Sequence, residues 1–487
     1  MQLEKVVLDV NEEKKLVKRL KDKMSHKNFC MHLTLLKMFC CSSRDALISM
    51  DSRFLMISER DNFLQLSIDL LEEILSRSTL LVTSEIEVYQ AANKWINYNL
   101  IERGKFSKRL LYKIRLPLLG KKTLETILSK KSCFRENKDS LAVINKILKS
   151  NFDFYRNKPS KFFTTRCCIH DSFDILYFGG YEKTTTDKTV GDKILQIKHS
   201  DNLKNFEIIS SLAGKRYDSE VVYLRGNVYI FGGFDGRVFS DLLYRHILKQ
   251  VEVYSHLTNT CKVVANIDDV NNDHFCSYAL CGFVNKIYLL GGYDERNLEL
   301  RSCIEFDTKD FSWKHKSKMT ERREYPAACV FEEKIIVSGG INYRVDYFAN
   351  LVNYYDKYDH QALYTVEAYD PISDTWTEFP TMNYSRCLHK SVVVKNKLFV
   401  IAGGTDINEV YESTSKKFTV LKPSFNLYDI TTNEPFAVFS VGHKVFTYFE
   451  GSSNIFCFDT KKGEWFEKPS EATKQLTSFS AITAPRL

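Results

Sequence analysis

Long apolar runs and metal-binding motifs are absent from this 487-residue sequence. Without a run of about 18 apolar residues it has no membrane span, and its charged opening does not resemble a secretory signal. HExxH and CxxC motifs do not occur and the 11 histidines are dispersed, so no metal or other cofactor is expected. The 13 cysteines form no activating cluster. This favours reduced structural thiols in the cytoplasm or nucleus, with a redox sensor as the alternative.

Phosphate-binding loops are absent as well, although paired glycines recur. No pair is followed by the residues that continue a phosphate loop at a helix start. Each pair instead ends an apolar run, at Gly179-Gly180, Gly232-Gly233, Gly291-Gly292, Gly339-Gly340 and Gly403-Gly404. A degenerate sixth copy ends at Glu450-Gly451. Successive copies lie 53, 59, 48, 64 and 47 residues apart, near the repeat of roughly 50 residues typical of a four-stranded propeller blade.

Two further features repeat together with the glycine pairs. An aromatic side chain is followed seven residues later by a large one, at Tyr254/Cys261, Phe306/Trp313, Tyr369/Trp376, Tyr411/Phe418 and Phe458/Trp465. An arginine precedes three of the pairs by 16 or 17 residues, at Arg216, Arg323 and Arg386. Alternating apolar residues around these positions predict strands. The glycines allow neighbouring backbone to approach closely, and the aromatic faces are suited to packing between blades.

Together these repeated parts resemble the kelch repeat. Six copies imply a six-bladed kelch β-propeller over residues 161–487. The final segment, QLTSFSAITAP, aligns with the strand that follows the arginine position in other copies. We therefore expect it to return and complete the first blade.

Residues 1–160 differ from the rest of the chain in charge and in periodicity. They hold 30 Lys plus Arg and 19 Asp plus Glu, a net charge of +11, whereas residues 161–487 hold 39 and 42, a net charge of −3. Apolar residues with helical spacing predict two amphipathic helices. The first face is Phe63, Leu66, Leu70, Ile74 and Leu75, and the second is Ile86, Tyr89, Ala92, Trp95 and Ile96. Ser84 and Glu87 form a capping-box pattern at the start of the second helix.

This helical region, followed by Arg103 and the segment LLYKIRLPLL, is similar to the BACK domain. BACK followed by kelch repeats resembles the kelch-like protein family. The resemblance implies an α plus all-β multidomain fold with four parts. These are a charged N-terminal segment 1–27, a helical BACK bundle 28–150, a linker 151–160 and a six-bladed kelch propeller 161–487. Family members carry a BTB domain before BACK, and the 27 residues before Asn28 are too few to hold one. A natural form without BTB and a truncated product both stay open.

In the kelch-like family, BTB and BACK bind cullin-3 and the propeller presents a client protein for ubiquitin transfer. The resemblance implies a substrate receptor that is not an enzyme and that binds a protein client, while cullin-3 recruitment without BTB is an open question. The alternatives are an actin-binding or other cytoskeletal scaffold, a decoy that lacks BTB and, less favoured, a propeller enzyme similar to copper radical oxidases. The expected location is the cytoplasm, with the cytoskeleton or the nucleus as alternatives.

A basic stretch in the helical region also needs an interpretation. It consists of Arg103, Lys108, Arg109, Lys113, Arg115, Lys121 and Lys122. A solvated helix face is the favoured interpretation, and contact with an acidic partner or a nucleic-acid backbone is the alternative. Stacking aromatics are not interleaved with these residues, so no specific nucleic-acid partner is expected.

In the family, partner peptides rest on the propeller face formed by residues after the glycine pairs and at the repeat arginine. The matching positions here are Tyr181, Phe234, Tyr293, Arg216, Tyr217, Arg323, Tyr325 and Arg386. A long loop in the fourth blade adds Tyr343, Arg344 and Tyr347, whose types are common at interface hot spots, and a loop of no particular role is the alternative. A basic face would favour an acidic or phosphorylated ligand. We expect replacement of Arg323 and Arg386 by Ala to abolish partner binding without unfolding; the alternative is that the arginines brace loops between blades.

Overall fold

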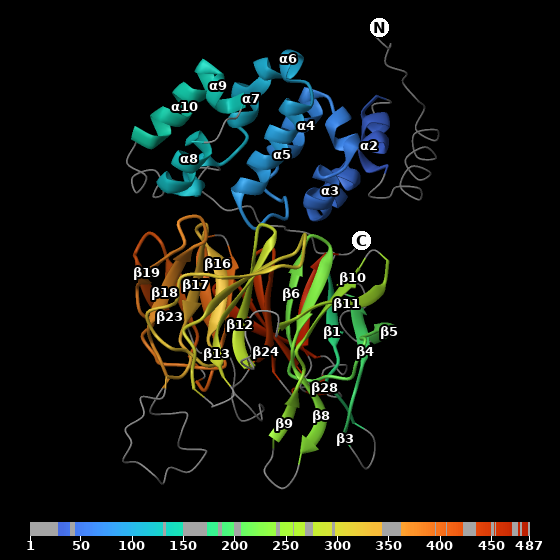
Figure 1. Cartoon of the computed structure of the whole chain (residues 1–487), viewed down its shortest axis with the longest axis vertical. Helices are drawn as coiled ribbons and strands as arrows, with labels where there is room; N and C mark the ends of the chain where they lie inside the picture. Colours follow the sequence, from blue (N-terminus) through green and yellow to red (C-terminus); the bar gives the residue numbers. More distant parts are fainter. Residues whose placement is uncertain are drawn as a thin grey trace. The chain divides into compact units, whose positions relative to one another are not determined.

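The computed structural model describes most of the chain. The described residues are 28–38, 44–129, 133–149, 173–183, 188–198, 206–239, 244–256, 258–267, 276–294, 298–342, 362–394, 396–405, 407–421, 435–449, 452, 454–469, 476–477 and 480–485. The chain divides into two compact units, residues 1–170 and 171–487. The first unit is helical and the second is built of strands (Figure 1).

The helical unit consists of short α-helices joined by 3-10 turns. The α-helices are α2 (Phe29–Met38), α3 (Arg44–Ser58), α4 (Ile68–Leu75), α5 (Glu85–Tyr98), α6 (Leu100–Arg103), α7 (Ser107–Leu111), α8 (Gly120–Ser129), α9 (Cys133–Glu136) and α10 (Lys138–Lys149). The 3-10 turns are η1 (Asp61–Gln65), η2 (Gly104–Phe106) and η3 (Leu116–Leu119). One hydrophobic core runs through the unit from α2 to α10.

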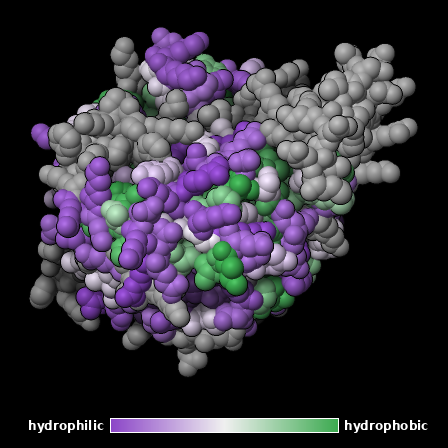
Figure 2. Space-filling model, turned by 90° about the horizontal axis from the view of Figure 1, so that it is seen from above, coloured by the Kyte–Doolittle hydropathy of each residue, from purple (hydrophilic) through white to green (hydrophobic). Residues whose placement is uncertain are grey.

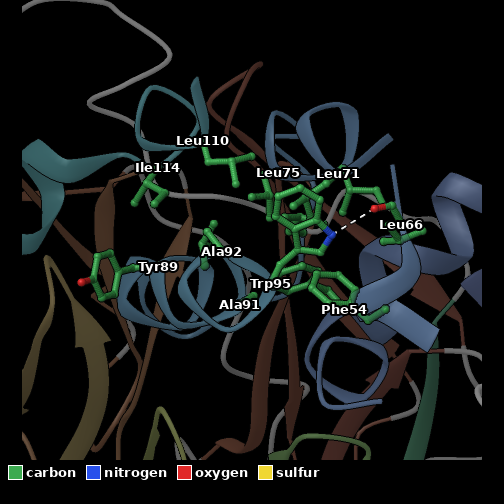
Figure 3. Packing of buried hydrophobic residues seen from close by; sticks show 14 of the residues in the cluster. Phe54, Leu66, Leu71, Leu75, Tyr89, Ala91, Ala92, Trp95, Leu110 and Ile114 are labelled. Atoms are coloured by element: carbon green, nitrogen blue, oxygen red, sulfur yellow. Dashed lines mark hydrogen bonds between the residues drawn. The ribbon is translucent and has the colours of Figure 1, made fainter. Parts of the chain in front are cut away.

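The two amphipathic faces predicted from the sequence form the centre of this core. Every residue of the first face is buried, and Trp95 of the second is buried with its indole N–H donating to the Leu66 carbonyl at 3.0 Å (Figure 3). The first face is not one helix, because Ser67 interrupts it and caps α4 by accepting from the Leu70 amide. The capping box of Ser84 and Glu87 is present at the start of α5, as predicted.

Six antiparallel sheets of four strands form the blades of the second unit. Blade one consists of β29 (Ser480–Pro485), β1 (Phe173–Phe178), β4 (Lys193–Lys198) and β5 (Phe206–Ser211). Blade two consists of β6 (Glu220–Leu224), β7 (Asn227–Phe231), β10 (Gln250–Ser255) and β11 (Thr260–Asn266). Blade three consists of β12 (Cys276–Phe283), β13 (Lys286–Tyr293), β14 (Cys303–Asp307) and β15 (Trp313–His315).

The other three blades follow the same plan. Blade four consists of β16 (Ala327–Phe331), β17 (Lys334–Ser338), β18 (Val366–Asp370) and β19 (Thr375–Phe379). Blade five consists of β20 (Lys390–Val394), β21 (Lys397–Ile401), β22 (Glu409–Glu412) and β23 (Lys417–Val420). Blade six consists of β24 (Pro435–Val441), β25 (Lys444–Phe449), β26 (Asn454–Asp459) and β27 (Glu464–Pro469).

The C-terminal strand closes the ring. β29 pairs with β1 from Ser480 opposite Phe178 to Pro485 opposite Phe173, so the last strand completes the first blade, as predicted. The innermost strands contact each other in the order β29, β6, β12, β16, β20, β24 and back to β29. This closed circle of neighbours defines a six-bladed propeller.

The repeated aromatic pairs lie at the packing surfaces between blades. Phe306 and Trp313 have ring centroids 4.6 Å apart, and Phe231 of the preceding blade meets Phe306 edge-on at 5.6 Å. Tyr369 and Trp376 repeat the pair at 4.9 Å in blade four. Each pair therefore fills the wedge between its own blade and the blade before it.

Blades one and two carry extra strands beyond the four-stranded plan. β2 (Tyr181–Lys183) pairs with β3 (Lys188–Val190) and β28 (Leu476–Thr477), and β8 (Phe234–Phe239) pairs with β9 (Tyr244–Ile247). All of them follow a glycine pair or precede an innermost strand, so they lie at the glycine-pair end of the propeller, where they project beyond the blades (Figure 1). Among the described residues, no helix is long and apolar enough to cross a membrane.

Candidate partner-binding site

At three places a glycine pair and a repeat arginine together connect two neighbouring blades, and we call each of these connections a joint. The backbone carbonyl of Arg216 accepts from the Gly180 amide at 2.7 Å, and the carbonyls of Arg323 and Arg386 accept in the same way from Gly292 and Gly340. A Cβ on the first glycine of each pair would collide with that carbonyl. Both glycines of these pairs also have positive φ, so the joint requires glycine for space and for conformation.

The arginine side chain then reaches into the next blade. Arg323 Nη1 donates to the carbonyls of Gly339 at 2.8 Å and Thr365 at 3.0 Å, and its Nη2 contacts the Glu367 carboxylate at 3.1 Å. Arg386 repeats this arrangement with the Ala402 carbonyl at 2.8 Å and Glu409 at 3.0 Å.

Arg216 makes the same joint between blades one and two. It donates to the Gly232 carbonyl at 3.0 Å and forms an ion pair with Glu252. Each of the three arginines thus joins the preceding blade through its backbone and the following blade through its guanidinium.

The glutamate partners are functional residues that the sequence interpretation missed. Glu252, Glu367 and Glu409 each stand two residues before the repeated tyrosine, and the equivalent residues in blades three and six are Ile304 and Phe456. The matching arginines are present only where the glutamates are, and this paired occurrence was the available signal. Burial lowers the pKa of all three arginines below the ordinary value, and the adjacent glutamates oppose the shift.

The joints change the interpretation of the arginines as a partner-binding face. Arg216, Arg323 and Arg386 are 0%, 0% and 1% exposed, so their guanidinium groups do not form a basic surface. The expectation that alanine at Arg323 and Arg386 leaves folding intact stays a prediction, and the ion pairs argue against it, because each replacement would leave a buried glutamate without its opposite charge. The geometry matches the alternative in which these residues brace the loops between blades.

The residue after Arg216 belongs to an aromatic stack that is half open to solvent. Tyr217 and Phe234 exchange two backbone hydrogen bonds of 2.9 Å. The ring of Tyr217 lies 5.4 Å from that of Phe234 and 4.6 Å from that of Tyr181. Tyr217 is buried in the middle, while Tyr181 and Phe234 are partly exposed on either side. We call Tyr181, Tyr217 and Phe234 the aromatic stack.

Of the other predicted tyrosines and Arg344, two have described contacts with blade three, and the rest fall outside the described residues. Tyr293 is opposite Cys276 in the sheet of blade three, and burial raises the pKa of its hydroxyl, with Cys276 and Tyr325 as close neighbours. Tyr325 has a positive φ of 52° and its amide donates to the Ser277 carbonyl at 2.9 Å. Tyr343, Arg344 and Tyr347 fall outside the described residues, so their role stays a prediction.

Several side chains of potentially reactive types are buried inside the propeller, where they pack between and within blades. Ser338 Oγ lies 2.8 Å from His389 Nε2 at the boundary of blades four and five, and both side chains are about 1% exposed. Burial, with Arg386 and other cations nearby, holds the pKa of His389 well below its ordinary value. Burial also raises the pKa of Cys281 and Cys457 to about 12, which disfavours reactive thiolates. Within the described part of the chain, no group of His, Cys, Asp or Glu is arranged to hold a metal ion.

Comparison with known proteins agrees with this architecture. The family model described as "Attractin/LZTR1 beta-propeller" matches residues 175–445, and the model described as "BACK: BTB And C-terminal Kelch" matches residues 37–129. The chain belongs to the kelch-like family of BACK–propeller proteins. The family and the fold predicted from the sequence are therefore confirmed.

Curated relatives of this kelch-like chain are distant in sequence. Kelch-like protein 7 of Rattus norvegicus is 25% identical over 382 residues, which cover 76% of this chain and 58% of the relative. Human kelch-like protein 28 is 25% identical over 49% of this chain and 40% of the relative. Kelch-like protein 26 of Danio rerio is 22% identical over 72% of this chain and 54% of the relative. The matched region thus spans about half the length of these relatives.

Proposed function

We propose that this kelch-like chain is a receptor without catalytic activity that binds a client protein at the glycine-pair end of the propeller. The aromatic stack carries this proposal. Tyr181 and Phe234 present partly exposed aromatic faces on a framework fixed by the Arg216 joint and by paired backbone hydrogen bonds. Large, rigid aromatic side chains dominate binding at protein interfaces because they bury much area at little conformational cost. The projecting strands β2, β3, β8 and β9 extend this surface at the same end.

The finer part of the proposal is recruitment to a cullin-3 ubiquitin ligase in the cytoplasm. Its support is the family membership and the order of the two units, BACK followed by propeller. The propeller would then hold the client while the helical unit belongs to the assembly that contacts the ligase. An actin-binding or other cytoskeletal scaffold is the second candidate, and no contact of the described residues favours it over the first.

Affinity purification from cells, followed by mass spectrometry, tests both the client-binding site and the recruitment to cullin-3. The wild-type chain is compared with the double variant Tyr181→Ser/Phe234→Ser and with Ile208→Ser as a control. Ile208 is 63% exposed on β5 of the same blade as Tyr181. We expect a client to be lost only in the stack variant, with cullin-3 present in all three samples. If the stack variant still binds the client, the proposed binding site is wrong. If the wild-type chain binds the client but no cullin-3 is recovered, only the proposed recruitment to the ligase is wrong.

A further inference from the structure

The helical unit contains a surface groove that the propeller site does not use. It lies between the start of α4, the end of α5 and the α6–η2 segment. Its apolar lining comes from Leu66, Ile68, Trp95 and Phe106. Trp95 donates its indole N–H to the Leu66 carbonyl at 3.0 Å within the hydrophobic core (Figure 3). Leu66 and Trp95 are each 2% exposed, so the apolar surface open to a partner side chain, the floor of the groove, comes from the partly exposed Ile68 and Phe106.

Two cations are held at the rim of the groove by aromatic rings. The Arg103 guanidinium lies 4.1 Å above the Trp95 ring and 5.2 Å above the Tyr98 ring, and its Nη1 donates to the Trp95 carbonyl at 3.0 Å. The Lys105 ammonium lies 5.1 Å above the Phe106 ring. Stacking restricts both side chains before any partner arrives, which lowers the entropy cost of binding.

Arg103 and Lys105 differ from Lys108, Arg109 and Arg115 of the basic stretch. Arg109 pairs with Glu72 and Asp69, and Lys108 lies 3.5 Å from Asp139. Arg115 is buried and donates to Ser78. Among the residues that the structure describes, Arg103 and Lys105 have no carboxylate partner. The carboxylate at the rim, Glu102, accepts from the side chain of Asn99. The groove therefore has two cationic side chains that can pair with an anionic group of a ligand.

Exposed apolar side chains lie at the end of α5, in α6 and directly after α7. Ile101 is 97% exposed, and Tyr98, Leu100 and Tyr112 are 54%, 44% and 51% exposed. Figure 2 shows patches of hydrophobic residues among hydrophilic ones on the molecular surface. Exposed apolar residues gathered in one short segment are typical of a surface that contacts another protein.

We propose that this groove binds an acidic segment of a partner protein. An apolar side chain of that segment occupies the floor, and its carboxylates pair with Arg103 and Lys105. Residues 28–150 hold 20 Lys plus Arg and 13 Asp plus Glu, a net charge of +7 that attracts an acidic partner over a distance. A nucleic acid fits less well, because it needs many phosphate contacts along a basic track, and Glu102 and Asp69 interrupt the track here.

The test uses the purified full chain and a defined fluorescent peptide. The peptide has leucine and phenylalanine at its centre and three acidic residues on each side. Fluorescence anisotropy measures its affinity for the wild type, for Lys105→Glu and Arg103→Gln, and for Lys121→Glu as the control. Lys105 and Lys121 are both exposed lysines of the helical unit, so these two variants change the total charge equally. A peptide with glycine and serine at its centre tests the apolar floor, and a single-stranded RNA of 20 nucleotides tests general binding of polyanions.

We expect saturable binding of the acidic peptide, weakened about tenfold or more by Lys105→Glu and by Arg103→Gln and unchanged by Lys121→Glu. The peptide with the glycine and serine centre should bind at least tenfold more weakly than the apolar one. Absence of saturable binding, or equal losses in Lys105→Glu and Lys121→Glu, overturns the proposal. RNA binding as tight as that of the peptide, with the same dependence on Lys105, also overturns it, because the groove would then be a general polyanion site.

Discussion

Replacement of Arg323 by alanine should destabilise the propeller strongly. The guanidinium makes six hydrogen bonds, to the Gly339 and Thr365 carbonyls and to the side chains of Thr365, Glu321 and Glu367. Because Glu367 is only 5% exposed, the variant leaves a buried carboxylate with no opposite charge. Loss of one partner of a buried pair costs about 3–5 kcal/mol. The free energy of unfolding should fall by this amount.

The neighbouring Arg322 provides a matched control for this experiment. It is exposed and donates one hydrogen bond, from Nη1 to the Glu299 carbonyl at 2.8 Å, so Arg322→Ala should cost about 1 kcal/mol or less. Urea unfolding followed by fluorescence compares the two variants. Glu367→Gln added to Arg323→Ala should restore part of the lost stability, because it removes the orphaned charge. Equal stability of the Arg322→Ala and Arg323→Ala variants would refute the interpretation of Arg323 as a joint between blades.

Three further perturbations test the ring and its joints. Gly291→Ala places a Cβ against the Arg323 carbonyl and should cost several kcal/mol in urea unfolding, whereas Gly404→Ala, with open space at its Cβ, should cost only about 1 kcal/mol from its positive φ; equal costs would contradict the joint. Truncation after residue 475 removes β29 and should abolish cooperative unfolding of the propeller, and an unchanged transition would contradict ring closure. Since the folded-state pKa of His389 is depressed, its contribution to stability is present above about pH 6.5 and is lost as the pH falls, by up to about 1.4 kcal/mol per pH unit. His389→Asn should reduce the dependence of the free energy of unfolding on pH between pH 7 and 5. An unchanged dependence would contradict the attribution of this stability loss to the buried His389.

The repeated sequence features predicted the architecture because each one has a single structural task. Glycine pairs mark strand ends where backbone approaches closely, and the seven-residue aromatic spacing marks the turn between the two outer strands of a blade. The return of the last strand to blade one also followed from alignment with the other copies. The break before α4 was missed because Leu66 and Leu70 keep helical spacing across Ser67, whose capping role depends on backbone conformation.

The candidate site was less predictable than the fold, because a residue's position in a repeat does not reveal its burial. Arg216, Arg323 and Arg386 were assigned to a surface by resemblance, yet their partners stand more than 20 residues later in the chain. The arginines and glutamates occur in the same blades, which was a signal in the sequence. Their direct contact follows only when the third strand of the blade is placed beside the loop before the first strand. Tyr181, Tyr217 and Phe234 were identified from the same resemblance, but their stacking depends on contacts between two blades.

Site-specific photo-crosslinking tests the central claim most directly. A photoreactive phenylalanine analogue replaces Phe234 in the aromatic stack or, as the control, Ile208 on β5, and cells that produce each variant are irradiated. Client binding at the glycine-pair end predicts one dominant crosslinked protein from position 234 that is absent from position 208. The same crosslinked proteins from both positions, or crosslinking from position 208 alone, would contradict it.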